Sequence, residues 1–144
     1  MKNNRKKLIS IFGFAVVAVI LFFILIKLIF PQNTFESSLK KHLNLVNHRS
    51  PYMLDKSTRF DSAGLQEDKT VVYYYTLTDT DSDELTIDQL KISVRPILLE
   101  RVKTDPAFEF LRKNNVTVGY LYRDKKGVEI FRLKFTAKEY KYEK

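Results

Sequence analysis

Residues 70–78, TVVYYYTLT, decide the fold, because most of their side chains are β-branched or aromatic. Such residues favour a β-strand, and no Gly or Pro interrupts the run. Side chains alternate between the two faces of a strand, which places on one face Val71, Tyr73, Tyr75 and Leu77. The other face then carries Val72, Tyr74 and Thr76. Since both faces are partly apolar, we expect a central strand or one that a helix covers.

The segments around this strand predict its neighbours. Residues 57–65 (STRFDSAGL) read as a second strand, and the short polar link QEDK predicts a hairpin between the two. A second hairpin is expected from residues 116–123 (VTVGYLYR) and 128–136 (VEIFRLKFT). The link DKKG joins these strands, and its Gly127 suits a turn that requires a positive φ.

Between the two hairpins the pattern changes to that of helices. Residues 79–83 (DTDSD) predict a turn, and a helix is expected from about Glu84 or Thr86 to Lys103. Pro96 lies inside it and should kink or split it near Val94 and Arg95. Its expected apolar stripe is Leu85, Leu90, Val94, Ile97, Leu98 and Val102.

A second, shorter helix is expected to start at Thr104 or Asp105, with Pro106 at its first position and with Phe108 and Leu111 facing inward. The charged C-terminal tail, AKEYKYEK, is expected to fray. Two hairpins separated by a pair of helices predict an α+β domain. Its expected core is a four-stranded antiparallel sheet with helices packed on one face.

The N-terminal sequence predicts a membrane anchor ahead of this domain. Nineteen uncharged, mostly apolar residues, 8–26 (LISIFGFAVVAVILFFILI), follow the basic tail 1–7 (MKNNRKK). A helix of this length covers roughly 28 Å, close to the thickness of the hydrocarbon core. We therefore expect a transmembrane anchor over 8–30, a juxtamembrane helix over 31–50 and an external domain over 51–144. The basic residues that set the topology are Lys2, Arg5, Lys6, Lys7 and Lys27.

This charge distribution predicts a cytoplasmic N-terminus and a domain in the periplasm or outside a bacterial cell, with the inner-membrane bilayer as a partner. A cleaved signal peptide is the alternative, but its apolar core is usually about 7–15 residues long and ends at a small-x-small site. A lipoprotein signal is excluded because the chain has no cysteine. A buried core helix is a third interpretation, although such helices are rarely apolar on every face.

The net charge of +8 does not predict nucleic-acid binding. The basic tail and Lys27 supply five of these charges, and topology explains them. The remaining +3 is ordinary for a soluble domain, and no basic motif with interleaved aromatic residues appears. We expect no nucleic acid among the partners.

No motif in the chain predicts a metal or cofactor. The acidic run that begins at Asp79 resembles the start of a calcium loop, but Glu84 stands at position six and Leu90 at position twelve, where Gly and Glu are required. Helix capping explains these acids more simply. His42 and His48 fall on different faces of the predicted helix, and we expect them to face solvent.

Catalytic motifs are likewise missing from the sequence. Ser37 precedes Lys40 by three residues, but without partner motifs the pair reads as surface. The sequence Asn115-Val116-Thr117 fits the pattern for glycosylation and is incidental at the start of a strand. We therefore expect a protein that is not an enzyme and has no cofactor.

The tyrosines form the most interesting set: Tyr73, Tyr74, Tyr75, Tyr120 and Tyr122. Hairpin strands could place Tyr73, Tyr75, Tyr120 and Tyr122 on one exposed sheet face, which would suit the binding of a protein partner. The other interpretation is that these residues form the core beneath the helices.

Two stretches carry a resemblance to a known group: VVYYYTLTD (71–79) and DPAFEFLRKNNVTVGYLYRDKKGVEIFRLKFT (105–136). A strand of YxYTL type, a helical pair and a VTxxYxYxDxxGxxI hairpin resemble small exported bacterial α+β domains of unknown function, many of them lipoproteins. The resemblance covers roughly residues 57–136 and implies this fold and export, without an activity. The group usually carries cysteines, whereas this chain has none and begins with the predicted anchor.

Taken together, these patterns predict a membrane-anchored bacterial protein whose external domain is a non-catalytic, protein-binding module of the cell envelope. Its expected partner is another envelope protein, and the oligomeric state stays open. A membrane-tethered enzyme that uses Asp79, Asp81 and Asp83 is one alternative. An assembly factor of an envelope secretion system is another, since a tether raises the local concentration at the membrane.

Overall fold

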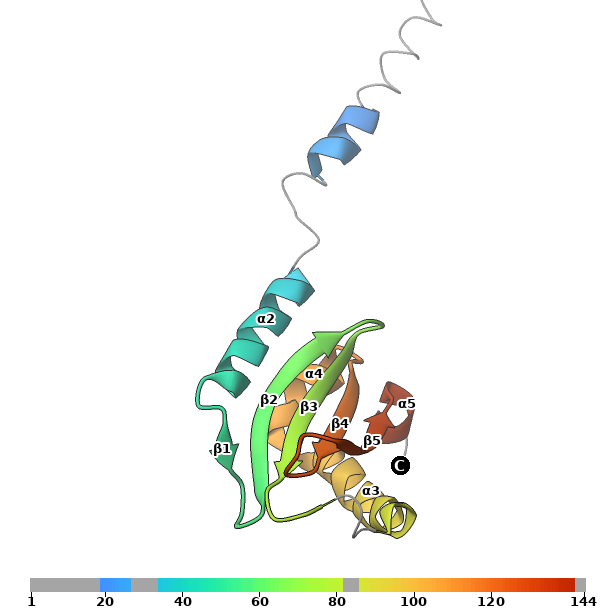
Figure 1. Ribbon diagram of the computed structural model, residues 1–144. Helices are drawn as coiled ribbons and strands as arrows, with labels where there is room; N and C mark the ends of the chain where they lie inside the picture. Colours follow the sequence, from blue (N-terminus) through green and yellow to red (C-terminus); the bar gives the residue numbers. More distant parts are fainter. Residues whose placement is uncertain (1–18, 27–33, 82–85, 142–144) are drawn as a thin grey trace, which may run out of the picture. The chain divides into compact units, whose positions relative to one another are not determined.

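The computed structural model describes residues 19–26, 34–81 and 86–141 (Figure 1). The chain forms two compact units, Met1–Ser38 and Leu39–Lys144. Within the first unit, residues 19–26 are helical. The second unit contains the whole sheet.

A mixed sheet of five strands forms the second unit, in the order β1-β2-β3-β4-β5. The strands are β1 (Tyr52–Met53), β2 (Thr58–Gln66), β3 (Thr70–Leu77), β4 (Thr117–Arg123) and β5 (Glu129–Phe135). The segment 70–78 is thus the central strand, as its composition predicted. Both predicted hairpins are confirmed, since β2 pairs antiparallel with β3 and β4 pairs antiparallel with β5.

The prediction of a four-stranded antiparallel sheet is wrong in two respects. The two-residue strand β1 adds a fifth strand at the edge of β2. In addition, β3 and β4 run parallel, with Thr70 opposite Thr117 and Thr76 opposite Arg123. Parallel neighbours need a crossover connection of a dozen or more residues, and the helices between Leu77 and Thr117 provide one. Hairpin patterns reveal only local pairing and therefore missed this long-range step.

The helices of the domain are α2 (Thr34–Asn47), α3 (Ile87–Thr104), the 3₁₀ turn η2 (Pro106–Phe108), α4 (Glu109–Lys113) and α5 (Ala137–Lys141). The predicted split at Pro96 does not occur, because α3 continues through that residue. Pro96 has no N–H to donate to the carbonyl oxygen of Ile92, one turn earlier, and Ile92 is 73% exposed. Ile97 is exposed rather than part of the apolar stripe, whereas Leu98 and Val102 are buried.

No helix among the described residues is long and apolar enough to cross a membrane. Of the anchor predicted over 8–30, the structure describes the helical residues 19–26, which are too few to span the hydrocarbon core. The transmembrane helix predicted as the first element is therefore not part of the fold that the described residues form. Outside those residues lie the predicted topology determinants Lys2, Arg5, Lys6, Lys7 and Lys27.

The end of α2 closes the outer edge of β2. The side chain of Asn47 donates a hydrogen bond of 2.8 Å to the carbonyl oxygen of Ala63 and accepts one of 2.7 Å from its N–H. Asn47 thus does for Ala63 what a neighbouring strand would do. Beyond a cis Ser50–Pro51 peptide bond, β1 continues the cover of the same edge. An edge strand covered in this way offers few free groups for pairing with another chain.

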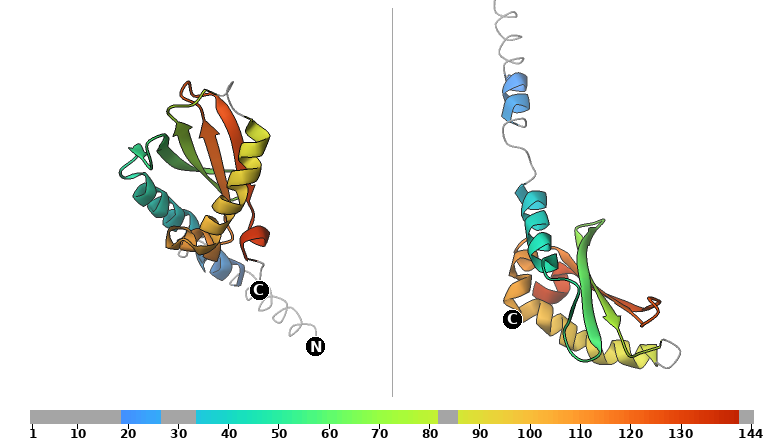
Figure 2. Two further views of the ribbon diagram at one scale, coloured as in Figure 1. Left: turned by 90° about the horizontal axis from the view of Figure 1, so that it is seen from below. Right: turned by 60° about the vertical axis from the view of Figure 1, so that its left-hand side comes forward.

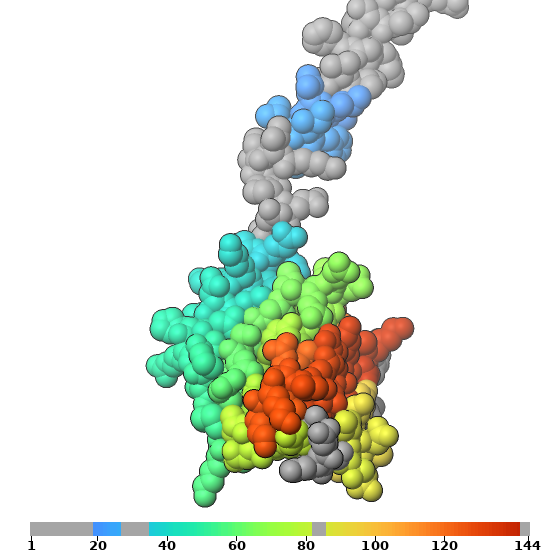
Figure 3. All heavy atoms as spheres, viewed as in Figure 1, coloured from blue at the N-terminus to red at the C-terminus, as the bar shows by residue number. Residues whose placement is uncertain are grey.

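The helix α3 crosses one face of the sheet, and of the described helices none lies on the opposite face (Figure 2). On that open face Val72 is fully buried between Gly64 and Gly119, its neighbours in β2 and β4. Tyr74 lies over Gly64, and its hydroxyl accepts a hydrogen bond of 3.1 Å from Gln66. Side chains of β2 and β5 form the surface on this side (Figure 3). Long side chains that lie flat on the strands therefore replace a covering helix.

The C-terminal tail does not fray up to Lys141, contrary to prediction. Glu139 caps the start of α5, since its carboxylate accepts hydrogen bonds of 2.8 Å from the Thr136 N–H and 3.0 Å from the Thr136 hydroxyl. The ring of Tyr140 is buried, and its hydroxyl donates to the carbonyl oxygen of Val116. The helix α5 was not predicted because charged residues alternate with Tyr in this segment and show no helical apolar stripe. Residues 142–144 lie outside the described part.

Candidate functional site

A row of aromatic rings lies on the face of the sheet that α3 crosses. The register of β3 and β4 places Tyr73 beside Tyr120 and Tyr75 beside Tyr122. The ring centroids are 5.9 Å apart in the first pair and 5.0 Å apart in the second. Phe131 of β5 extends the row, with its centroid 4.7 Å from that of Tyr122. These rings form the floor of two adjoining hollows.

The larger hollow, which we call the aromatic groove, has a volume of about 810 Å³. Its floor consists of Phe60, Tyr73, Tyr75 and Phe108. Its rim comes from the end of α2 and from the segment around β1, where Leu45 is 69% exposed, Tyr52 43% and Leu54 41%. The volume falls in the range of roughly 300–1,000 Å³ that is usual for small-molecule sites.

The second hollow, of about 510 Å³, lies beneath the first half of α3. Leu90 and Val94 of the helix line it on one side, and Tyr122 and Phe131 line it on the other. Leu90 and Val94 are half-buried, so this half of α3 does not close onto the sheet. The second hollow and the aromatic groove share Leu54 and Arg101, which places Arg101 at the junction of the two.

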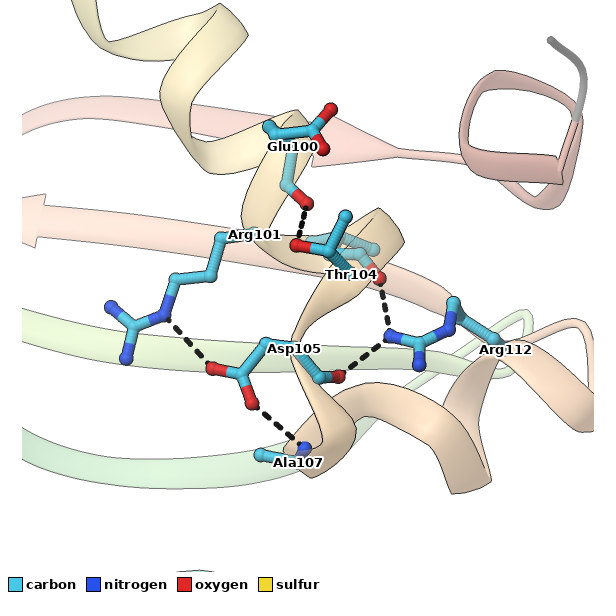
Figure 4. A network of polar contacts seen from close by, with 7 residues as sticks. Glu100, Arg101, Thr104, Asp105, Ala107 and Arg112 are labelled. Carbon is cyan, nitrogen blue, oxygen red and sulfur yellow. Dashed lines mark hydrogen bonds and ion pairs between the residues drawn. The ribbon is translucent and has the colours of Figure 1, made fainter.

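Arg101 extends from α3 across the strands, and Asp105 holds it (Figure 4). Its Nε lies 3.5 Å from Oδ2 of Asp105. The other carboxylate oxygen of Asp105 accepts a hydrogen bond of 2.9 Å from the N–H of Ala107, and its backbone carbonyl accepts one of 2.8 Å from Arg112. In the part of the chain that the structure describes, Arg101 has no other hydrogen-bond partner. Four of the five N–H donors of its guanidinium are therefore free to bind water or a ligand.

The tyrosine hydroxyls around Arg101 are also unused. Tyr120 has a buried hydroxyl without a hydrogen-bond partner, and among the described residues the hydroxyls of Tyr73, Tyr75 and Tyr122 have none either. Burial raises the pKa of Tyr122 to about 12 and raises the pKa values of the other three as well, while Arg101 opposes the rise in each case. All four phenols therefore stay neutral at physiological pH and retain their hydrogen-bond donors.

The charged side chains of the aromatic groove carry an excess of one positive charge. Arg49 at the rim and Arg101 are the cations, and Asp105 is the anion. Arg49 has no ion pair among the described residues, whereas Asp105 is already engaged by Arg101. His48 also lines the rim and is exposed. Electrostatically, this groove favours an anionic ligand.

The tyrosines predicted to bind a partner come together at this site, but not as an open patch. Tyr73 and Tyr75 line the groove, Tyr122 lines the second hollow, and Tyr120 lies between them. Tyr73, Tyr75 and Tyr120 are at most 6% exposed, which agrees with the interpretation of these residues as core. Tyr74 lies on the opposite face. A role for the tyrosines in partner binding stays a prediction.

The acids considered for catalysis lie elsewhere. Asp79 accepts a hydrogen bond of 3.0 Å from the hydroxyl of Ser57, and Asp81 forms an ion pair of 2.7 Å with Lys126. The hydrogen bond from Lys126 holds the pKa of Asp81 below its ordinary value. Asp83 lies outside the described residues. Neither Asp79 nor Asp81 lines the groove or the second hollow.

The two histidines have different surroundings. His42 does not simply face solvent, because its ring stacks on Phe110 with 5.2 Å between centroids. Its Nε2 is buried without a partner, and burial lowers the pKa of this side chain. His48 is exposed, as predicted, at the rim of the groove.

Sequence reasoning missed Arg101, which is the central polar group of the site. It lies three residues after Leu98 and directly before Val102, at the border of the apolar stripe of α3. A charged residue at such a border can extend over the protein core, and this is the signal that could have singled it out. The short segment around Tyr52 and Leu54 was also missed because two residues carry no periodic pattern.

Comparison with solved structures finds this fold in a Pseudomonas aeruginosa protein that is described as secreted by inference. The TM-score is 0.63 at 12% sequence identity, and the match covers 73% of this chain and 91% of the other. At such an identity the similarity concerns the fold alone. A comparison with curated proteins gave no match.

Comparison with family models gives a match over residues 34–131, which include α2, the first four strands, α3, α4 and the start of β5. The aromatic groove lies wholly within these residues. The expectation of a small domain of unknown function is thereby confirmed. The chain belongs to the family described as a domain of unknown function, DUF8479.

Proposed function

We propose that the protein is an exported, non-catalytic binding module of the bacterial cell envelope, and that the aromatic groove is its binding site. The observation that carries the proposal is the groove itself, which combines an aromatic floor, an exposed apolar rim and a guanidinium with free donors. An apolar hollow with a few converging polar groups is the usual form of a ligand site.

The groups that line the groove suit binding better than bond cleavage. A tyrosine must lose its proton to act as a base or nucleophile, and burial raises the pKa values of Tyr73 and Tyr75. The carboxylate of Asp105 is occupied by Arg101 and by the N–H of Ala107. The groove therefore offers apolar contacts and hydrogen bonds, which hold a ligand without transforming it.

The proposed location is the outer side of the cytoplasmic membrane. The basic and apolar residues 1–30 support export and retention at that membrane. The fold that the chain shares with a protein inferred to be secreted supports the same compartment. A phosphatase reporter that folds only outside the cytoplasm should be active when fused to the C-terminus of the full chain. A C-terminal reporter that worked only in the cytosol would contradict this location.

The binding role is tested by photo-crosslinking in cells. A photoreactive amino acid replaces Leu45 or Tyr52 at the groove rim. The control position is Leu65 on β2, which is 51% exposed and does not line the groove. We expect adducts from both rim positions above the level at Leu65. Absence of adducts at both rim positions, in a protein expressed at the normal level, would refute the groove as the binding site.

The predicted partner, another envelope protein, is proposed to contact the exposed rim of the groove rather than its aromatic floor. The exposed apolar side chains of Leu45, Tyr52, Met53 and Leu54 favour it, since such residues gather where a second molecule covers a surface. The masses of the crosslinked adducts show whether a protein, a small molecule or both contact the rim. An added mass of several kilodaltons or more identifies a protein partner.

A further inference from the structure

We propose that the aromatic groove binds a fatty acid, with the carboxylate at Arg101 and the hydrocarbon chain over the aromatic floor. This inference rests on the proposed function, because it names the ligand class of the same groove. It is carried by three properties of the groove: its charge, the position of its unused donors and the nature of its walls.

The charge of the groove matches a monoanion. Arg49 and Arg101 together exceed Asp105 by one positive charge. A fatty acid carries one negative charge at neutral pH and leaves no excess of either sign. A phosphate monoester carries roughly −1.5 to −2 and would bring a second charge without a partner into a partly buried site. Charge complementarity therefore favours a monoanion such as a carboxylate over a phosphate monoester.

Unused donors line both hollows next to Arg101, with Tyr75 in the lining of the groove and Tyr122 in that of the second hollow. The guanidinium of Arg101 is planar and can bind both oxygens of a carboxylate at once. Asp105 occupies only Nε, at 3.5 Å, so the Nη atoms remain available. The neutral phenols of Tyr75 and Tyr122 share the linings of the two hollows with Arg101 and offer further donors there. Arg101 thus marks the position of the ligand's head group.

The walls of the groove suit a hydrocarbon chain better than a peptide. Phe60, Tyr73 and Phe108 form the floor through their side chains, while the backbone groups of β2 and β3 pair within the sheet. A peptide would bury amide groups with few partners, which is costly, whereas an acyl chain has no such groups. The second hollow is the less suitable place for the chain, since Asp55 and Thr58 are in its walls.

The experiment uses the full chain in detergent-free membrane particles and a photoactivatable palmitate as the probe. We expect the probe to label peptides that line the groove. Unlabelled palmitate should compete with it, whereas methyl palmitate, which has the same chain without the charge, should compete at least roughly tenfold less well. This comparison needs no substitution and stands even if a variant fails to fold.

Variants then test the head-group position. Arg101→Gln should weaken labelling roughly tenfold or more, and Arg101→Lys, which keeps the charge, should restore part of it. Arg132→Gln is the matched control, because Arg132 pairs with Glu129 on β5 and does not line the groove. It should label like the unchanged protein.

Several outcomes would overturn the inference. Equal competition by palmitate and methyl palmitate would show that the carboxylate is not recognised. Labelling confined to residues 8–26, or labelling that Arg101→Gln leaves unchanged, would place the probe elsewhere than proposed. Stronger competition by a single-chain lipid with a phosphate head would identify a different head group. The in-cell crosslinks separate this inference from the proposed function. Protein adducts without lipid adducts at the rim would refute the fatty acid and leave the binding site in place, whereas no rim adducts would refute both.

Discussion

The hydroxyl of Tyr140, near the end of α5, donates a hydrogen bond of 2.7 Å to the backbone carbonyl oxygen of Val116, just ahead of β4. Tyr140 is 5% exposed and Val116 is fully buried. The last helix is therefore tied to the start of the parallel strand pair by a bond that water does not share.

Tyr140→Phe tests this tie. The substitution keeps the ring and leaves a buried carbonyl oxygen without its donor, so we expect the free energy of unfolding to fall by about 1–3 kcal/mol. Chemical denaturation measures the change. Tyr52→Phe is the control, since Tyr52 is 43% exposed and should lose little stability. Equal effects of the two substitutions would contradict a structural role for the Tyr140 hydroxyl.

Asn47→Ala tests the closure of the β2 edge. The variant removes one donor and one acceptor and leaves the N–H and C=O of Ala63 without these partners. We expect a loss of about 1–3 kcal/mol in the free energy of unfolding and faster hydrogen exchange at the Ala63 amide. Asn44→Ala, at an exposed position of the same helix, should leave both quantities nearly unchanged. An Ala63 amide that stays fully protected in Asn47→Ala would show that the bond is dispensable.

Gly119→Ala tests the packing of the open sheet face. A Cβ at Gly119 would lie 2.9 Å from Cγ2 of Val72, whose branched side chain has little freedom to move. We expect a loss of about 1–3 kcal/mol from overpacking. At Gly64 the nearest atom, Cε2 of Tyr74, would be 3.7 Å away, so Gly64→Ala should be tolerated. Thermal unfolding of both variants measures their stabilities. If Gly119→Ala were more stable than Gly64→Ala, the prediction of overpacking at Gly119 would be wrong.

Alkaline pH should unfold the domain through its buried phenols. A tyrosine in an unfolded chain ionises near pH 10, whereas burial raises the pKa of Tyr122 to about 12 in the folded state. Below about pH 10 both states keep the proton, so this contribution to stability is complete. Above it the unfolded state binds fewer protons, and stability falls until the pH reaches the folded-state pKa. Tyr73, Tyr75 and Tyr120 act in the same direction.

Denaturation at a series of pH values measures this fall in stability. Tyr122→Phe removes one of the contributing groups and should make the decline above pH 10 less steep. An unaltered slope in Tyr122→Phe would show that the ionisation of this phenol is not linked to unfolding.

The strands and both hairpins could be predicted from the sequence because their pairing is local. The polar links QEDK and DKKG join strands with clear alternation, and Gly127 has the positive φ that its turn requires. No turn sequence signals the parallel pairing of β3 with β4. This pairing is determined by the contacts of the intervening helices with the sheet. The strand β1 is too short to show any period.

The site could be predicted only in part. Tyr73, Tyr75, Tyr120 and Tyr122 were singled out because aromatic residues alternate along both strands, and the parallel register then brings them together. Their burial was one of the two interpretations that the sequence left open, since it depends on which sheet face α3 crosses. Arg101 was missed because its position depends on two features that the spacing of apolar residues does not reveal. These are the hollow that the first half of α3 leaves over the sheet and the contact with Asp105.

The parallel pairing of β3 and β4 also has a consequence for how the chain reaches its native state. The two hairpins can each form from nearby residues, but the central pair must close a loop that runs from Leu77 to Thr117. Closing such a loop is slow relative to hairpin formation. We therefore expect the hairpins to form first and to join late, with the edge of β3 briefly uncovered. During that interval a nascent chain is most exposed to association with its copies.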